Sequence, residues 1–230
     1  MALAAVPALA GGQMFEGKVT MTMTSPRGAT PIEMYLKDGV SRMEMQTPQG
    51  GAIATIIDPV KKEMIMIIPE RNMYMKRSTE PTANPNAPAP AERTKADIKK
   101  TGKTETIAGM SCEHYTVTEE TGETDVCLAS GMGTFMGMGG GMGRGMGGGM
   151  GGGMGRGMGG GGGGGAQMAW SRDLEKGMFP LKATNKEGQV VLLVTAIEKK
   201  KLDATMFGIP DGFQDVSGMM GGGGGRPPRF

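Results

Sequence analysis

The sequence predicts a mainly β protein, built on one antiparallel sheet and interrupted by a Gly/Met-rich insertion. Between residues 15 and 77, apolar residues alternate with polar ones, as expected for half-buried strands. Asp38-Gly39 lies between two such runs and is a strong hairpin signal, because both residues tolerate positive φ. Segment 137–160 repeats Gly-Met-Gly-X, a composition that cannot build a core.

Six strands are expected before residue 78. In FEGKVTMTMTS, residues Val19, Met21 and Met23 share one face. In PIEMYLKDG, Met34 shares a face with Ile32 and Leu36. Short strands joined by tight turns predict an antiparallel meander rather than an α/β unit. The remaining four strands are SRMEMQT, GAIATIID, KEMIMII and NMYMKR.

After residue 78 the elements are spaced more widely. Residues 78–92 form a Pro-rich loop, and a short helix is expected over residues 91–100. SCEHYTVT and ETDVCLA predict a hairpin that turns between Glu119 and Gly122. AQMAWSRDLEKG predicts a short helix or an irregular segment, and ATMFGIPDGFQDV an extended strand. FPLKATNKEGQVVLLVTAIEKKKL predicts two strands joined at 185–188.

The predicted organisation is one domain, residues 14–130 and 166–216, with appendages. Residues 131–165, here called the Gly/Met tract, form a disordered insertion, and residues 217–230 form a disordered Gly-rich tail. Residues 1–10 end in Ala8-Leu9-Ala10 and are typical of the remnant of a signal peptide, although an Ala-rich N-terminus is the alternative. A periplasmic or secreted location follows, and no apolar run is long enough to predict a transmembrane segment.

Two cysteines, Cys112 and Cys127, flank the predicted hairpin turn. A loop of this length can place them opposite each other on one face, so a cross-strand disulfide is expected, as in exported proteins. Two buried free thiols are the alternative. A metal pair is less favoured, because the single histidine, His114, brings no evident third strong ligand with it.

The strand IAGMSCEHYTV, with the pattern I-x-G-x-x-C-x-x-Y, and the closing FGIPDGF resemble a secreted bacterial family of domains of unknown function. Its members are similar in fold to the periplasmic lipoprotein carriers LolA and LolB, so the resemblance implies an incomplete antiparallel half-barrel wrapped over one or two short helices. It covers residues 14–130 and 166–216. The resemblance implies fold and compartment more strongly than function.

Catalysis and nucleic-acid binding are not expected. The sequence contains no nucleophile elbow, HExxH helix, phosphate loop or dinucleotide fingerprint. Its acidic residues between Glu119 and Asp125 have the ordinary interpretation of a solvated hairpin tip. A formal net charge of +2 provides no basic footprint for nucleic acid, and no cofactor is expected.

Methionine is the most informative residue type, with 25 in the chain. Met residues spaced two apart on strands share a face, so several strands together can present a Met-lined surface. That surface is either an ordinary core or a plastic concave cavity for an acyl chain, because flexible thioethers repack around varied ligands. A Cu(I) or Ag(I) site is a third interpretation. The candidate residues are Met21, Met23, Met34, Met43, Met45, Met64, Met66, Met73 and Met75.

The Gly/Met tract has a regular period but no ordered geometry to match it. Glycine costs about 1 kcal/mol relative to alanine in a helix, so the repeat is expected to be a mobile spacer. Soft-metal binding or reversible thioether oxidation are the alternatives. The candidate metal ligands are Met138, Met142, Met146, Met150, Met154 and Met158.

These observations favour a non-enzymatic envelope protein that binds a lipid or an acylated peptide on a Met-lined concave face. The alternatives are a soft-metal binding or buffering protein and a purely structural envelope protein.

Overall fold

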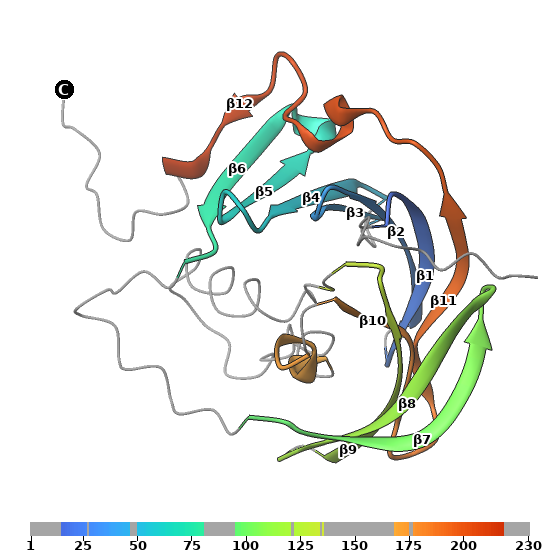
Figure 1. Cartoon of the computed structure of the whole chain (residues 1–230). Helices are drawn as coiled ribbons and strands as arrows, with labels where there is room; N and C mark the ends of the chain where they lie inside the picture. Colours follow the sequence, from blue (N-terminus) through green and yellow to red (C-terminus); the bar gives the residue numbers. More distant parts are fainter. Residues whose placement is uncertain are drawn as a thin grey trace, which may run out of the picture.

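The computed structural model describes residues 15–26, 28–46, 50–80, 95–120, 122–133, 135, 168–174 and 177–218. The strands form one open sheet of twelve strands in the order β12-β6-β5-β4-β3-β2-β1-β11-β10-β9-β8-β7. Figure 1 shows this sheet as a deep curve with β12 at one edge and β7 at the other. The mainly β, largely antiparallel class predicted from the sequence is confirmed.

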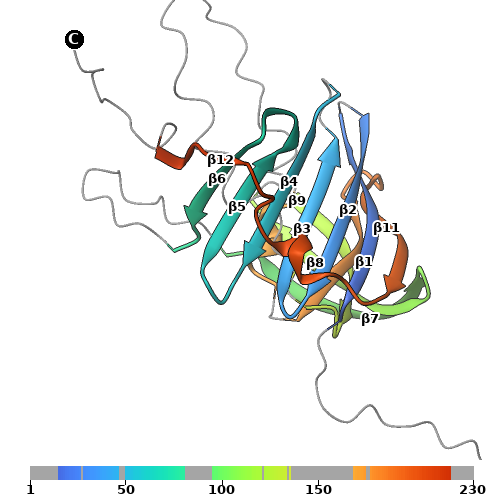
Figure 2. The ribbon, with the colours of Figure 1, turned by 90° about the horizontal axis from the view of Figure 1, so that it is seen from above.

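The first six strands are consecutive neighbours, and Figure 2 shows them side by side in chain order. The expected meander is therefore present, because each apolar–polar run ends at a turn that returns the chain antiparallel. At the Asp38-Gly39 turn both residues have positive φ, 49° and 79°. The strands are β1 (Gly17–Ser25), β2 (Gly28–Lys37), β3 (Val40–Gln46), β4 (Ala52–Asp58), β5 (Glu63–Ile68) and β6 (Met73–Ser78).

The second half of the chain extends the sheet from the other side of β1. Strand β11 pairs antiparallel with β1, and the remaining strands follow outward to the β7 edge. The hairpin around the cysteines and the pair joined at residues 185–188 are both found where the sequence predicts them. These strands are β7 (Asp97–Ile107), β8 (Met110–Glu119), β9 (Gly122–Ser130), β10 (Met178–Asn185) and β11 (Val190–Lys199).

Two local predictions are wrong. Within the helix expected over residues 91–100, residues 97–100 belong to β7, because pairing with β8 supplies ladder hydrogen bonds that outweigh local helix propensity. Residues 91–94 lie outside the described part of the chain. The strand expected over ATMFGIPDGFQDV is mostly absent: Ala204–Phe207 form the 3-10 helix η3, capped by Asp203, and only Gln214–Asp215 form a strand, β12.

The main hydrophobic core lies on the concave side of the sheet, around the 3-10 helix η2 (Ala169–Arg172). Trp170 is fully buried there, as is Phe179 of β10. Phe179 meets Phe135 edge-on, with ring centroids 5.3 Å apart. Met132 and Phe135 are buried, which corrects the expectation that the whole Gly/Met tract is excluded from the core. A bulky apolar side chain at the edge of a Gly-rich segment still gains free energy from burial.

The convex side carries a smaller core beneath the segment that follows β11. Ala54, Ile56, Ile65 and Ile67 form this cluster on β4 and β5. Ile209 and Phe213, from the segment between η3 and β12, pack against it. A further 3-10 helix, η1 (Pro69–Arg71), joins β5 to β6. In the described residues, no helix has both the length and the apolar character needed to cross a bilayer.

Candidate functional site

Strand registers place the nine methionines proposed as ligand-binding residues on one face of the sheet. Met34 lies directly opposite Met43, and Met66 directly opposite Met75. Thr55 of β4 lies between these two pairs, opposite both Met43 and Met66. Two cross-strand rows result, one running Val19, Met34, Met43, Thr55, Met66, Met75 and the other Met21, Ile32, Met45, Ile53.

On β1–β3 this face contains a closed core at Met21, Met34 and Met43, whereas Met23 and Met45 are half-buried. Met21 and Met34 are 0% and 1% exposed, and they belong with Met43 to the cluster that contains Trp170. A side chain buried to this degree touches protein on all sides. These three residues therefore act as core residues in this conformation.

Toward β6 the same face is less covered. Met45 and Met73 are half-buried, as are Ile53 and Ile68 between them in register, and Met64 is half-buried on the other side of the Met66–Met75 pair. We call these five residues the methionine patch. Next to it, Met66 and Met75 form a small cluster with Val216, which follows β12. The patch is where the sheet retains apolar surface that is not fully packed.

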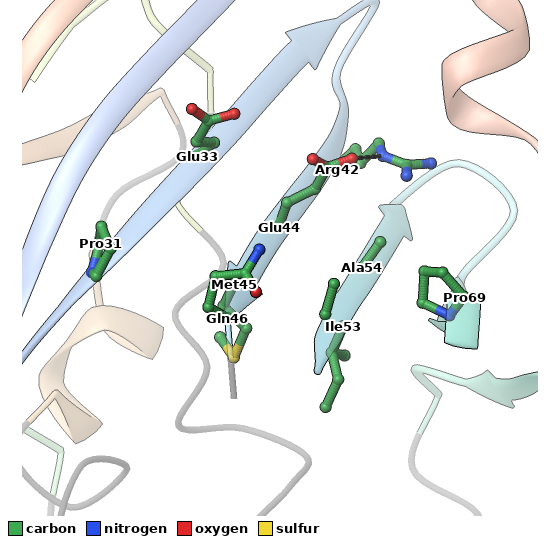
Figure 3. Close-up of a pocket in the computed structure, with 10 residues that line it drawn as sticks. Pro31, Glu33, Arg42, Glu44, Met45, Gln46, Ile53, Ala54 and Pro69 are labelled. Atoms are coloured by element: carbon green, nitrogen blue, oxygen red, sulfur yellow. Dashed lines mark hydrogen bonds and ion pairs between the residues drawn. The ribbon is translucent and has the colours of Figure 1, made fainter. Parts of the chain in front are cut away.

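A cavity of about 260 Å³ lies at the ends of β2, β3 and β4 (Figure 3). Its lining includes Glu33, Arg42 and Glu44 together with Pro31 and Pro69. Arg42 Nε donates to Glu44 Oε1 at 2.7 Å, and its Nη1 donates to the carbonyl of Met206. The charged groups of the cavity wall are thus engaged with one another and with the backbone.

Glu33, in the wall of this cavity, accepts hydrogen bonds from two further side chains. Lys18 Nζ donates to Glu33 Oε1 at 2.6 Å, and Tyr35 Oη donates to Oε2 at 2.7 Å. The Lys18 hydrogen bond is the main reason why the pKa of Glu33 lies below its ordinary value. Burial, followed by the bond to Glu33, raises the pKa of the Tyr35 hydroxyl. This arrangement holds Glu33 as a carboxylate and Tyr35 as a neutral donor.

The cysteines form a disulfide, with 5.4 Å between the Cα atoms of Cys112 and Cys127. The pairing is confirmed, but the two residues are not directly opposite. Register places His114 opposite Cys127, so the disulfide runs diagonally across the hairpin. Glu119 pairs with Gly122 at the turn. In this register, the residue of β8 that lies opposite Cys127 is two positions after Cys112.

A polar cluster surrounds His114 beside this disulfide. Its Nδ1 lies 2.6 Å from Asp125 Oδ1, and its Nε2 lies 3.2 Å from Glu105 Oε2. Lys182 Nζ donates to both oxygens of Glu105, and this bond is the main reason why the pKa of Glu105 lies below its ordinary value. Glu105, His114 and Cys127 have potential ligand atoms within 4.8 Å of one another.

Sequence reasoning missed this cluster. It treated Asp125 as a solvated turn residue and found no third strong ligand near Cys112 and His114, whereas register places Glu105 opposite Cys112. Glu105 lies in the region joined to the cysteine hairpin by β7–β8 pairing, and local spacing alone does not reveal that register. The six methionines proposed as tract ligands, Met138 to Met158, lie outside the described residues.

Comparisons with known proteins identify the family of this chain. A search of curated proteins finds no match. Among fourteen matching chains of solved structures is a structure of PNGF-II, with a TM-score of 0.45 and 12% identity, covering 87% of this chain. The chain spans 30% of the length of that protein. A family model described as "Domain of unknown function (DUF4412)" matches residues 15–149, which is more than half of the chain. The chain belongs to the DUF4412 family.

Proposed function

We propose that the protein is a non-enzymatic, exported protein that binds the apolar chain of a lipid or an acylated peptide on the concave side of its sheet. The methionine patch carries this proposal, because it is half-buried apolar surface continuous in register with the main core. Thioethers adapt to ligands of different shape, which suits a site for flexible acyl chains.

The finer fold assignment supports the same function. We infer a half-barrel similar to LolA and LolB, and the curvature of the sheet around η2 supports this inference (Figure 1). A curved sheet with an apolar concave face can enclose a ligand that a flat sheet would leave in water.

Export is supported by two observations. The sequence begins with a segment typical of a signal peptide remnant. Cys112 and Cys127 are joined in a buried disulfide, and such bonds persist mainly in oxidising compartments.

Native mass spectrometry of the protein purified without delipidation tests the proposal. A bound mass in the range of a lipid, together with uptake of a fluorescent fatty acid, is expected. Only the bare apo mass and no uptake of the probe would contradict binding and favour the purely structural alternative.

A matched pair of variants locates the site. Met64→Gln with Met73→Gln places polar amides in the methionine patch, and about 1 kcal/mol of lost apolar burial at each site predicts a roughly tenfold or greater weaker fatty-acid affinity. Met206→Gln makes the same change on η3, which contacts the opposite face through Arg42. Equal fatty-acid affinities of the natural chain and the two variants would show that the ligand does not bind at the patch.

Soft-metal binding is the second candidate, and the directly opposed Met34/Met43 and Met66/Met75 pairs favour it. Thioethers select Cu(I) and Ag(I), and paired strands hold two sulfurs close together. Anaerobic Cu(I) titration should compare the intact protein with a Met66→Leu/Met75→Leu variant and with a variant whose tract methionines are leucines. Equal, weak uptake by all three would remove this candidate.

A further inference from the structure

We propose that reduction of the Cys112–Cys127 disulfide opens a zinc site on strands β7, β8 and β9, with Cys112, Cys127, His114 and Glu105 as ligands. The proposal is independent of the apolar ligand, because it uses none of the methionines.

Strand register brings the four residues together. On β8, Cys112 and His114 are two residues apart and therefore share a face. Glu105 of β7 is directly opposite Cys112, and Cys127 of β9 is directly opposite His114. Two thiolates, an imidazole and a carboxylate thus occupy adjoining positions on three hydrogen-bonded strands. These are the three ligand types that zinc prefers in proteins.

Three of the ligand atoms are already close to the spacing that one ion requires, and the two sulfurs separate when the disulfide is reduced. The ligand atoms of Glu105, His114 and Cys127 all lie within 4.8 Å of one another, and the sulfur of Cys112 is bonded to that of Cys127. A tetrahedral zinc ion with bonds of about 2.0–2.3 Å holds its ligand atoms roughly 3.3–3.8 Å apart. The ligand atoms of Glu105, His114 and Cys127 therefore need to approach by about 1 Å, while on reduction the sulfur of Cys112 moves away from that of Cys127 and toward the ion.

The surroundings already orient two of the ligands. Asp125 holds His114 through Nδ1, which leaves Nε2 directed at Glu105. A carboxylate on the remote nitrogen of a metal-binding histidine fixes the ring orientation and increases its basicity. Lys182 Nζ donates to both carboxylate oxygens of Glu105, at 3.2 and 3.1 Å, which fixes the position of that side chain. Cys112 and Cys127 are 2% and 0% exposed, so the thiolates would bind the ion away from bulk water.

In the oxidised chain the site is incomplete, because the sulfurs of a disulfide are not thiolate ligands. Only His114 Nε2 and one oxygen of Glu105 then face each other, since Asp125 occupies the other side of the ring. A water-soluble phosphine reduces the bond by two electrons: the phosphine and one water become phosphine oxide, and the disulfide becomes two thiols. Zinc binding then releases the two thiol protons.

The test uses the full, untagged chain in its oxidised and phosphine-reduced forms, with the phosphine removed anaerobically before zinc is titrated against a chromogenic chelator. The reduced chain should bind one zinc ion at least about 100-fold more tightly than the oxidised chain. In the reduced form, His114→Gln should weaken binding by more than about 100-fold and Asp125→Asn by about 10–100-fold. Glu113→Gln, on β8 but with its side chain bonded to Lys100, is the matched control and should leave affinity unchanged.

Cobalt provides a readout that structural damage alone would not produce. Co²⁺ in the reduced chain should give a thiolate-to-metal charge-transfer band that His114→Gln and Glu105→Gln alter and Glu113→Gln does not. Equal zinc affinity in both redox forms, or in His114→Gln and the natural chain, would overturn the proposal. A reduced chain that loses its strand circular dichroism signal and does not regain it with zinc would also overturn it.

Discussion

Trp170 shows how single residues hold this molecule together. It is fully buried on the concave side, within a cluster that also contains Met21, Met34 and Phe179. The element η2 is one short turn, and Trp170 is its largest fully buried side chain. Burial of the indole therefore positions the covering segment over the core.

Trp170→Ala should lower the free energy of unfolding by about 3–5 kcal/mol, because it leaves a large cavity between η2 and the sheet. Urea denaturation monitored by circular dichroism measures the change. Val60→Ala is the control, since Val60 is 83% exposed and loses almost no burial. A loss below about 1 kcal/mol for Trp170→Ala would mean that η2 does not contribute to the core.

Asp58 stabilises the turn between β4 and β5. Its Oδ1 accepts from the amides of Val60 and Lys61, at 3.0 and 2.9 Å. The Lys61 backbone hydrogen bond is the main reason why the pKa of Asp58 is lower than its ordinary value of 3.8. The turn therefore favours the ionised carboxylate.

Asp58→Ala should cost about 1–2 kcal/mol at neutral pH, and the difference should shrink in acid. A carboxyl whose folded pKa is depressed contributes fully above its unfolded pKa and loses that contribution as pH falls through the folded value. Unfolding free energies measured from pH 7 downward should show the natural chain approaching the variant below about pH 4. A constant difference at every pH would show that the carboxylate charge is not involved.

At the scale of residues, the sequence predicts partners that are close along the chain and misses those brought together by the sheet. The Cys112–Cys127 disulfide was predictable, because both residues belong to one hairpin. The contact between Lys182 and Glu105 was not, because it depends on the registers of four strands, and β10 is separated from β7, β8 and β9 by the Gly/Met tract. The burial of Phe135 was hidden by the glycines around it.

Among the elements, β7 has the most exposed position. It forms one edge of the sheet, and nearly all of its side chains face solvent, including Lys99, Lys100 and Lys103. Its pairing with β8 is also irregular between Lys100 and Thr104. Edge lysines and bulges discourage pairing with another chain.

Replacing Lys99, Lys100 and Lys103 with valine should produce dimers or larger assemblies, because it removes this protection from the edge. Size-exclusion chromatography with light scattering measures the mass. The control replaces Lys199, Lys200 and Lys201 with valine, which removes the same charge beside β11, a strand paired on both sides. Association of both variants would point to charge loss rather than to the β7 edge.

Element prediction was most accurate where one face of a strand is buried. Strands β1 to β3 alternate buried and half-buried residues, so their periodicity is visible in the sequence. Strand β7 has only Ile107 buried and therefore no apolar period to read. Its extended conformation comes from hydrogen bonding to the edge of β8.

In the whole molecule, the start of the Gly/Met tract and the segment that follows the tract are both anchored in the core. Met132 and Phe135 precede the residues that the structure leaves undescribed, and Met168 and Trp170 follow them. All four side chains belong to the main core cluster. A deletion must keep these anchors if it is to test the tract alone.

Replacing residues 137–166 with a Gly/Ser linker of about ten residues, which reaches roughly 17 Å, should leave the melting temperature nearly unchanged. Extending the deletion to residue 132 removes two buried side chains and should lower it by about 10 °C or more. Differential scanning calorimetry compares the two. A large fall with the shorter deletion would assign the tract a structural role.

The overall fold was predictable because its strands are short, alternating and separated by clear turns. The order in which the two halves join was not. Nothing local identifies β11 as the partner of β1, since the choice depends on which apolar faces complete a common core. The sequence also showed which methionines share a face within each strand, but not which of them lie opposite each other on neighbouring strands.

The β1–β11 pairing also has a consequence for synthesis. Gly17 pairs with Lys199, so two strands that are far apart in the sequence meet in the middle of the sheet. A growing chain can form the β1–β6 meander early, yet one side of β1 stays unpaired until β11 leaves the ribosome. Such distant contacts slow folding and leave strand edges open to other chains. The unpaired side of β1 is therefore open to mispairing until β11 has been made.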